Sequence, residues 1–391
     1  MGSKHKIVLG SLFGDEGKGN VVQWLCKNSS KPIVYRFSGG PQAGHRVVYK
    51  DKSHICSSWG SGVLLGVPTY LSENVFIDPI CIYNEYKTLV DEGIEVPPLY
   101  INNDCLVITP YDVLANSADA KIQKDGTCGK GIYNTYKRCQ SGNTTWAVNI
   151  AAESWDIILD EAEDYYQPKM NIELCALFEE ACAFLVDHPD IFQFTEMSPL
   201  DYVKESEYDT VIWEGSQGLL LDMDCGFMPH CTPSKVGLNG IPEYILEKSP
   251  EIYLVMRPYS TRHGNGWEFT DKCNLTEYFT LDEPSNKDDG IQGIFKRGIF
   301  DFPLFCRAID RHRLDNYQKM YDLKFNIVVT HWDCIKGDNI PINIGIITEH
   351  PMSKKAFIES LTFCRLPMSH VYLGIGEDSN IIDSKTILDY V

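Results

Sequence analysis

The feature that most constrains the fold is a glycine-rich turn directly after a short apolar segment. Residues 7–9 read IVL, typical of a buried strand, and residues 14–19 read GDEGKG. A helical pattern follows from about Lys18 to Asn28, and residues 32–37 read as the next strand. Glycines let the backbone approach a phosphate, and the N–H groups that open a helix point toward it. This order predicts an α/β fold with a mainly parallel sheet.

Three further predicted strands, at residues 210–213, 252–256 and 325–329, each run into polar residues. In open parallel sheets, ligands gather beyond the carboxyl ends of the strands. No linker rich in Pro, Gly or Ser divides the chain. We therefore expect one domain over residues 1–391, with insertions and a P-loop-like, GTPase-related fold whose central sheet is flanked by helices.

Two longer segments have compositions that predict their structure. Residues 151–190 are rich in Ala, Leu, Glu and Asp at helical spacing and are predicted to be helical. Residues 271–293 are polar and rich in Asp, Asn and Thr, which predicts a long surface loop of the kind that often carries function.

Composition limits the partners. The 391 residues include 35 basic and 54 acidic ones, a net charge of −19, which argues against a sequence-independent nucleic-acid-binding protein. No apolar run reaches the ~18 residues of a membrane span. The 14 cysteines include no CxxC pair and are predicted to be reduced thiols in the cytoplasm.

The glycine-rich turn departs from the Walker pattern in an informative way. Leu12 stands where that pattern needs Gly, and Gly19 stands where it needs Ser or Thr, so a hydroxyl ligand for magnesium is missing. Lys18 supplies a positive charge for phosphates. Asp15 adds an acid where a phosphate loop usually avoids one, which makes sense if Asp15 ligates a metal ion or abstracts a proton.

Six other polar segments are candidates for the site. The histidine that ends GGPQAGH fits a general acid or base as well as a structural histidine. The cations after residue 131 and those near residue 296 suit anions such as phosphate and carboxylate. The aspartate of THWD could read the donors of a guanine. The segments are residues 39–45, 125–131 with Lys137 and Arg138, 214–218 with Thr232, 261–266, 292–298 and 330–333.

Together these segments resemble the adenylosuccinate synthetase family. The closest matches are GDEGKG at residues 14–19 and AGH at residues 43–45, and the other segments follow in the family's order from about residue 7 to 380. The resemblance implies a carbon–nitrogen ligase of purine nucleotide biosynthesis. Such an enzyme joins L-aspartate to the 6-oxo position of inosine monophosphate (IMP) and uses GTP and Mg²⁺. It also implies a homodimer.

The resemblance implies a role for each candidate residue. Asp15 would take the proton from N1 of the purine, His45 would stabilise charge as O6 attacks the γ-phosphate, and Gln217 would act beside them. Asp15 and the carbonyl of Gly44 would ligate Mg²⁺. The implied binding residues are Gly14, Gly17, Lys18, Gly19 and Asp333 for the triphosphate; Gln42, Thr127, Arg138 (from a partner subunit), Gln217 and Thr232 for the monophosphate; and Lys296 and Arg297 for aspartate.

Several positions depart from the family's pattern around the substrates. Gln42 replaces the usual Asn, Cys128 replaces a second Thr, and His331 replaces a Lys. The loop rich in Thr and Arg is reduced to residues 292–297, and residues 233–236 read PSKV where Asn and Thr are usual. These departures concern the identity of the purine and of the donor more than the type of reaction.

Three functions stay open on the sequence. The first is a ligase acting on IMP. The second is a phage-type relative that uses deoxyguanosine monophosphate (dGMP), with ATP as a candidate donor; such relatives often replace the loop acid, whereas Asp15 is retained here. The third is a regulatory nucleotide-binding protein without ligase activity, which would need neither an aspartate site nor His45.

Overall fold

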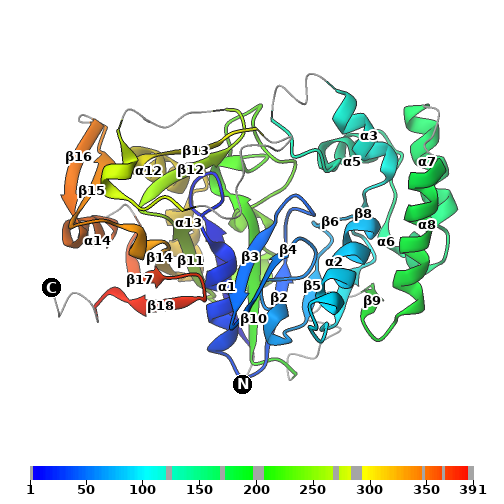
Figure 1. Cartoon of the computed structure of the whole chain (residues 1–391), viewed down its shortest axis with the longest axis horizontal. Coiled ribbons are helices and arrows are strands. Elements are labelled where there is room, and N and C mark those ends of the chain that lie inside the picture. The colour runs from blue at the N-terminus through cyan, green and yellow to red at the C-terminus, as the bar shows by residue number, and fades with distance from the viewer. Residues whose placement is uncertain are drawn as a thin grey trace.

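A ten-stranded sheet forms the centre of the molecule (Figure 1). The computed structural model describes residues 3–119, 126–167, 172–196, 207–266, 273–282, 293–345, 348–362 and 366–385. Every neighbouring pair in the sheet is parallel except β17–β18. In spatial order the strands are β18 (Asn380–Asp383), β17 (Met368–Ile375), β14 (Lys324–Val329), β11 (Glu251–Met256), β1 (Lys4–Gly10), β10 (Thr210–Gly218), β2 (Pro32–Arg36), β5 (Thr69–Leu71), β7 (Leu99–Asn102) and β9 (Phe192–Thr195).

Smaller β-structures stand beside this sheet. The larger of them is a four-stranded sheet in the order β12 (Tyr259–His263), β13 (Phe295–Asp301), β15 (Asn339–Asn343) and β16 (Thr348–Ser353). The others are the hairpin of β3 (His45–Tyr49) with β4 (Lys52–Cys56), and the parallel pair of β6 (Phe76–Ile77) with β8 (Leu106–Val107).

Helices connect and cover the strands. The α-helices are α1 (Lys18–Lys27), α2 (Pro79–Asp91), α3 (Pro110–Ala118), α5 (Ile132–Gln140), α6 (Ala147–Ala151), α7 (Trp155–Tyr166), α8 (Ile172–Asp187), α10 (Glu243–Leu246), α11 (Leu275–Tyr278), α12 (Phe302–Arg311), α13 (Leu314–Tyr321) and α14 (Lys354–Thr362). Short 3₁₀ turns are η1 (Val63–Leu65), η2 (Leu219–Leu221), η3 (Leu238–Gly240) and η4 (Trp332–Cys334).

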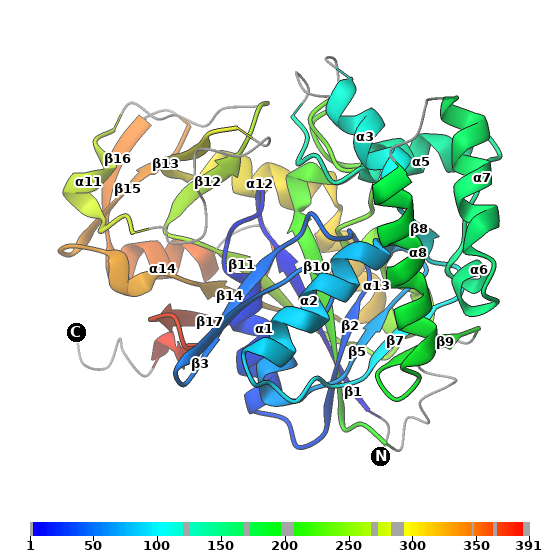
Figure 2. The ribbon, with the colours of Figure 1, turned by 45° about the vertical axis from the view of Figure 1, so that its right-hand side comes forward.

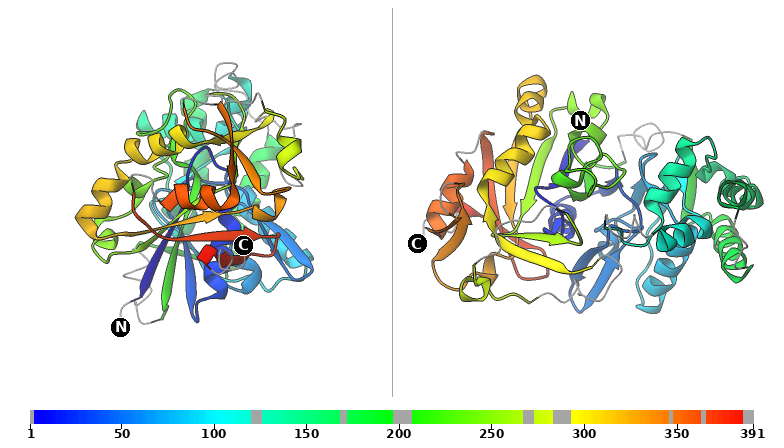
Figure 3. Two further views of the ribbon diagram at one scale, coloured as in Figure 1. Left: turned by 90° about the vertical axis from the view of Figure 1, so that its left-hand side faces the viewer. Right: turned by 90° about the horizontal axis from the view of Figure 1, so that it is seen from above.

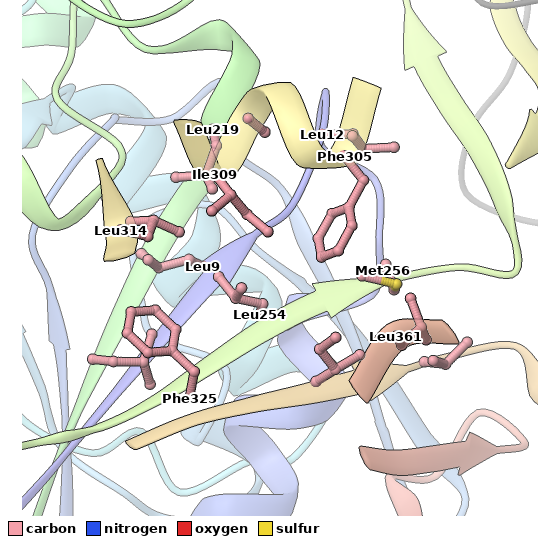
Figure 4. Packing of buried hydrophobic residues seen from close by; sticks show 14 of the residues in the cluster. Leu9, Leu12, Leu219, Leu254, Met256, Phe305, Ile309, Leu314, Phe325 and Leu361 are labelled. Atoms are coloured by element: carbon pink, nitrogen blue, oxygen red, sulfur yellow. The ribbon is translucent and has the colours of Figure 1, made fainter. Parts of the chain in front are cut away.

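The central strands are buried on both faces, so they read as continuous apolar runs. On one face Leu9, Leu254 and Phe325 pack against α12, α13 and α14 through residues such as Ile309 and Leu361 (Figure 4). On the other face Val8, Ile212 and Val255 pack against Val21, Val22 and Leu25 of α1. Seen from above, the yellow α12 lies on the opposite side from the blue β3–β4 hairpin (Figure 3).

A second apolar cluster lies toward β9, where β5 and β7 pack with α2, α7 and α8. Helices α2 and α8 run side by side there (Figure 2). This cluster anchors the segment that leads through α3 to α5.

The predicted α/β class with a mainly parallel sheet is confirmed. The helical prediction for residues 151–190 is also confirmed in its described part, as α7 and α8. The predicted loop at residues 271–293 is wrong in part, because residues 275–278 form α11, while residues 283–292 lie outside the described part. No helix in the described part of the chain is long and apolar enough to cross a membrane.

Candidate active site

The turn after β1 has a left-handed backbone over much of its length. Gly14, Asp15 and Gly17 have φ angles of 89°, 58° and 88°. Glycine adopts this conformation at no steric cost, whereas an aspartate there is uncommon and needs support from its surroundings. Asp15 is half-buried at this turn. The sequence-predicted catalytic acid therefore stands at the most constrained backbone position of the loop.

Two threonine hydroxyls from distant parts of the chain hold this turn. Thr261 Oγ1 donates to the carbonyl of Gly14 at 2.9 Å, and Thr330 Oγ1 donates to the carbonyl of Glu16 at 2.6 Å. Thr261 comes from β12, and Thr330 directly follows β14. Both threonines were part of the polar segments seen in the sequence, but their role as supports of the loop emerges only from the fold.

Helix α1 opens with its N–H groups free of any side-chain cap. Gly17 is its N-cap residue and makes no side-chain cap hydrogen bond. Uncapped N–H groups and the helix dipole together favour an anion at this end. The buried ammonium of Lys18 stands in the same turn, and burial lowers its pKa against the opposing effect of nearby carboxylates. This end of α1 thus offers N–H groups and an ammonium to an anion, and phosphate binding here stays a prediction.

Glu16, to which the sequence assigned no role, is buried in the loop. Its Oε1 accepts from the backbone N–H of Leu12 at 2.5 Å, and its Oε2 has no hydrogen-bond partner among the described residues. Burial raises the pKa of Glu16 to about 7, although the charge of Lys18 opposes the shift. Gly10 must be glycine here, since a Cβ would lie 2.2 Å from Glu16 Oε2.

His45 lies against the start of α1 and is held by a buried carboxylate. A Cβ on Gly19 would lie 3.2 Å from His45 Cβ, a tighter contact than most, so glycine eases this close approach. His45 Nδ1 lies 2.5 Å from Glu214 Oε1, and Ser61 donates to Glu214 through its N–H at 3.0 Å and through its hydroxyl. Glu214 comes from β10, which runs beside β1.

The electrostatics of this pair fix the form of the imidazole. Burial lowers the pKa of His45 although Glu214 opposes the shift. Burial alone would raise the pKa of Glu214, but His45, Arg36 and Ser61 bring it below its ordinary value. Near neutral pH the pair is therefore a neutral imidazole whose Nδ1–H donates to a carboxylate. This leaves His45 Nε2 as the nitrogen that can face a substrate.

Gln217 packs directly against the phosphate loop. It has a left-handed backbone with φ of 54°, and a Cβ on Gly14 would lie 3.5 Å from Gln217 Cα. The next residue, Gly218, pairs with Gly10 in the parallel ladder. The structure therefore brings Gln217 beside the turn that carries Asp15, and its catalytic role stays a prediction.

Gln42 has a buried amide that the protein does not satisfy. Neither its Oε1 nor its Nε2 has a hydrogen-bond partner among the described residues. An unsatisfied buried amide costs about 1–3 kcal/mol, so a bound polar ligand is a good explanation for it. The loop that carries Thr232 reaches the same place, because Ser234 Oγ accepts from the N–H of Gly39 at 3.0 Å. Gln42 and the Thr232 loop thus converge.

The candidate loop that contains Thr127, described from residue 126 to 131, is held together by hydrogen bonds of this threonine. Its hydroxyl donates to Asn116 Oδ1 at 2.8 Å and accepts from the N–H of Gly129 at 3.1 Å. Gly126 lies against Asn265, since a Cβ there would be 3.4 Å from the backbone nitrogen of Asn265. This contact brings the loop to the segment after β12.

Arg138 does not lie where the sequence prediction needs it. Its side chain is fully buried and forms a bidentate pair with Asp112, with Nε–Oδ1 at 3.0 Å and Nη2–Oδ2 at 2.9 Å. It also donates to the carbonyl oxygens of Asn143 and Val107 and to Thr145 Oγ1. The predicted contact to a nucleotide from a partner subunit therefore does not fit, because Arg138 donates inside its own chain.

Lys296 and Arg297 lie on β13 rather than in a loop. Arg297 is directly opposite Thr261 in the antiparallel ladder, and Lys296 is opposite Arg262. Side chains that face each other across a ladder share one side of the sheet, and successive residues alternate. Arg297 therefore shares the side of Thr261, which touches the phosphate loop, whereas Lys296 is on the other side. The two cations cannot act as one clamp.

Asp333 lies beyond the carboxyl end of β14, in η4, and its side chain is exposed. It follows Thr330, which holds the phosphate loop, and His331, which has φ of 55°. Burial and the charge of Arg257 hold the pKa of His331 well below its ordinary value, so this imidazole is neutral. Asp333 is thus at the same edge of the sheet as the loop and is open to a ligand.

A pocket of about 750 Å³ lies outside the β3–β4 hairpin. Its lining includes Arg46, His54, Glu85 and Lys130, but none of the residues predicted for the site. Asp15, His45 and Gln217 instead lie around the start of α1, away from this pocket.

Comparison with known sequences gives one family. The sequence model of the adenylosuccinate synthetase family matches residues 7–309. The adenylosuccinate synthetase of Francisella philomiragia is 29% identical over 313 residues, which cover 76% of this chain and 72% of the relative. That of Halothermothrix orenii is 30% identical over 332 residues, covering 78% and 74%.

Two solved structures share the fold. A fully ligated adenylosuccinate synthetase from Plasmodium falciparum superposes with a TM-score of 0.73 at 20% identity, covering 97% of this chain and 99% of that one. The succinoaminodeoxyadenylate synthetase of cyanophage S-2L, bound to dGMP and to dATP as an energy donor, superposes with a TM-score of 0.65 at 14% identity. That match covers 100% of this chain and 98% of the phage protein.

Proposed function

We propose a reaction from one premise: the chain belongs to the adenylosuccinate synthetase family and is a carbon–nitrogen ligase. The reaction is the GTP-dependent condensation of L-aspartate with the 6-oxo position of IMP. A regulatory protein without activity is set aside, because the family consists of enzymes. The observation that supports the proposal most is the group formed by Asp15, Gln217 and the His45–Glu214 pair around the open end of α1.

In this proposal the residues of the turn carry out the first step. The Asp15 carboxylate accepts the proton from N1 of the purine, and negative charge builds on O6. O6 then attacks the γ-phosphate of the donor. Positive charge or hydrogen-bond donors aimed at developing charge give the largest part of such catalysis. Lys18 and the N–H groups near Gly14, Gly17 and Gly19 hold the phosphates, and His45 lies beside the transferred group.

The amine of aspartate then displaces the phosphate from C6. Arg297 is the better candidate for the aspartate carboxylate, since it shares the side of Thr261, whereas Lys296 faces away from it. Gln42, Thr127 and Thr232 bind the monophosphate nucleotide with Gln217, and Asp333 reads the base of the triphosphate. The unsatisfied amide of Gln42 supports a polar ligand at this place.

Asp15 and the backbone carbonyl of Gly44 would hold Mg²⁺, because both offer the oxygen ligands that this ion prefers. A bound Mg²⁺ would neutralise charge on the phosphates of the donor. Gly44 directly precedes His45, whose backbone runs past Gly19 of α1.

The phage-type reaction on dGMP, with ATP or dATP as donor, is the second candidate. The phage enzyme that shares this fold was captured with dGMP and dATP. Retention of Asp15 favours IMP instead, because relatives that accept a 2-aminopurine often replace this acid. We take IMP and GTP as the leading pair.

One assay separates these candidates. The purified protein is given L-aspartate and Mg²⁺ with IMP, GMP or dGMP and with GTP or ATP, and phosphate release is measured. Aspartate-dependent release with IMP is expected. Release with dGMP alone would establish the second candidate, and no aspartate-dependent release with any pair would rule out both.

We also propose a homodimer in the cytoplasm. Family membership supports the dimer, and a sequence with no CxxC pair among its 14 cysteines supports a reducing compartment. Sedimentation velocity at several protein concentrations tests the assembly. A single monomeric species throughout would contradict it.

A further inference from the structure

The segment between η2 and η3 is long and has no helix or strand among residues 222–237. It carries Thr232 and Ser234, and Ser234 Oγ accepts a hydrogen bond from the N–H of Gly39 in the segment at residues 39–45. Asp222 is fully buried at its start and organises it. One oxygen, Oδ1, accepts from the N–H groups of Asp224 and Cys225 and from Asn239, and Oδ2 accepts from the N–H of Val236 at 2.7 Å.

Three metal-ligand side chains meet at this point. A carboxylate oxygen of Asp222, the Sγ of Cys225 and a ring nitrogen of His312 all lie within 4.8 Å of one another. Ligand atoms on a tetrahedral zinc ion are ~3.3–3.8 Å apart, as follows from bond lengths of ~2.0–2.3 Å. Small side-chain rotations would therefore close the site. His312 ends α12, so the ligands come from segments far apart in the chain.

The ring orientation and the tautomer of His312 are those that a metal ligand requires. Its Nε2 lies 2.7 Å from the carbonyl of Leu219, to which it can only donate. The proton on Nε2 leaves Nδ1 with a lone pair. A ligating histidine almost always donates its other N–H to such a partner, which fixes the ring. Nδ1 points at the loop, because a Cβ on Gly237 would lie 2.4 Å from it.

The other two ligands also have capacity for an ion. Oδ2 of Asp222 accepts one hydrogen bond, and a carboxylate oxygen has two lone pairs. Cys225 is half-buried, and Arg311 holds its segment by donating to its carbonyl and to that of Gly226, the latter at 2.7 Å. Cys231 lies close by, since a Cβ on Gly226 would be 2.7 Å from its Sγ.

We propose that Asp222, Cys225 and His312 form a binding site for a zinc-class divalent transition metal, distinct from the Mg²⁺ of the proposed reaction. The thiolate selects a soft or borderline ion and disfavours Mg²⁺. On binding, the thiol loses its proton to solvent as the S–metal bond forms. The fourth position is open to water. The ion would link the loop that carries Thr232 to the end of α12.

Cobalt is the probe for this site, because only a thiolate ligand gives Co²⁺ a sulfur-to-metal charge-transfer band. The full-length protein is treated with chelator and titrated with Co²⁺ and then Zn²⁺. We expect a band that saturates at one equivalent and that Zn²⁺ abolishes. Cys225→Ser should abolish the band, and His312→Asn should weaken binding by more than ~10-fold. The control Cys175→Ser, in α8, should leave it unchanged.

Hydrogen exchange gives a second readout that does not depend on activity. Zn²⁺ should slow exchange in residues 222–237 of the wild type and leave exchange in Cys225→Ser unchanged. Circular dichroism verifies that each variant is folded. If His312→Asn does not fold, Cys225→Ser, which changes a half-buried side chain, still tests the proposal. A missing band, or a band that survives in Cys225→Ser, would overturn the proposal.

Discussion

At the residue scale, function in this chain depends on side chains held in unusual surroundings. Asp15 has a left-handed backbone, Glu16 is buried with an unsatisfied oxygen, and His45 is neutral against Glu214. Perturbed groups of this kind cluster at functional sites more often than elsewhere. Each is maintained by neighbours from other strands, which makes its contribution measurable by substitution.

Glu214→Gln is expected to lower kcat by ~10²-fold and to change KM little, because the amide no longer fixes the tautomer of His45. Steady-state kinetics measures kcat and KM, and urea unfolding measures whether the variant keeps its stability. Glu85→Gln is the matched control, since this buried glutamate lies 3.3 Å from His54, outside the proposed site. A kcat within twofold of wild type in Glu214→Gln would mean that Glu214 does not position His45.

Glu16 predicts a pH dependence of stability. Its folded pKa of about 7 lies above the ordinary value of 4.5, so the unfolded state loses this proton more readily. The contribution of Glu16 to stability is then full below about pH 4.5 and declines as pH rises to about 7. Glu16→Gln should remove this decline.

Urea unfolding of wild type and Glu16→Gln at about pH 5, 6, 7 and 8 provides the measurement. The stability of the variant relative to wild type should grow from pH 5 to about 7 and then level off. A difference that is constant over this range would show that Glu16 has an ordinary pKa.

At the element scale, the site is built where strand ends meet. The turn after β1 is supported by the hydroxyl of Thr330, directly after β14, and by that of Thr261, within β12 of the smaller sheet, and Glu214 and Gln217 belong to β10. Parallel neighbours place their carboxyl ends at one edge, so residues far apart in the chain become neighbours. Single changes in these supports should affect the loop without touching a substrate.

Thr330→Val removes the hydroxyl that donates to the carbonyls of Glu16 and Met256. We expect a loss of ~1–3 kcal/mol in the free energy of unfolding and a higher KM for the triphosphate. Thr362→Val, which removes a hydroxyl that donates to Glu359 in α14, is the control and should leave KM unchanged. Equal KM values in both variants would show that Thr330 does not support the loop.

Arg138→Ala tests the corrected role of this residue. Removing one partner of a buried pair leaves Asp112 uncompensated and should cost ~3–5 kcal/mol in the free energy of unfolding. Urea unfolding is the measurement, and Lys137→Ala, next to it on α5, is the control. A variant of normal stability with a raised KM for the monophosphate would instead restore the nucleotide-binding role.

At the scale of the whole molecule, two apolar layers enclose one sheet while the surface is strongly acidic. The net charge of −19 means that like charges repel in the compact state. The net negative charge of the chain repels anionic substrates, and the cationic groups of the candidate site must overcome this repulsion. Anionic substrates must be attracted locally, by Lys18 and the open end of α1.

Sodium chloride should consequently raise the stability of this protein. Screening lengths fall from about 30 Å at 0.01 M to about 10 Å at 0.1 M, which weakens the repulsion between surface charges. Thermal unfolding across this range should show a rising midpoint. A flat or falling midpoint would mean that attractive pairs balance the excess of acid.

The sequence alone predicted the α/β class and several elements of the central sheet. The apolar run at residues 7–9, the glycines that follow and the helix from Lys18 could be read because turns, helix starts and buried strands each depend on residues close in the chain. The roles of Asp15 and His45 were implied by the resemblance to a family and stay predictions.

Only the tertiary structure decided which polar residues meet. Glu214 with His45, Thr330 with Glu16 and His312 with Asp222 are pairs from distant segments, and their contact depends on strand order and register. The same reason explains the two revisions. Arg138 was predicted to bind the monophosphate, but the packing of α5 places it against Asp112. Lys296 and Arg297 were predicted to hold aspartate together, but β13 places them on opposite sides of a sheet.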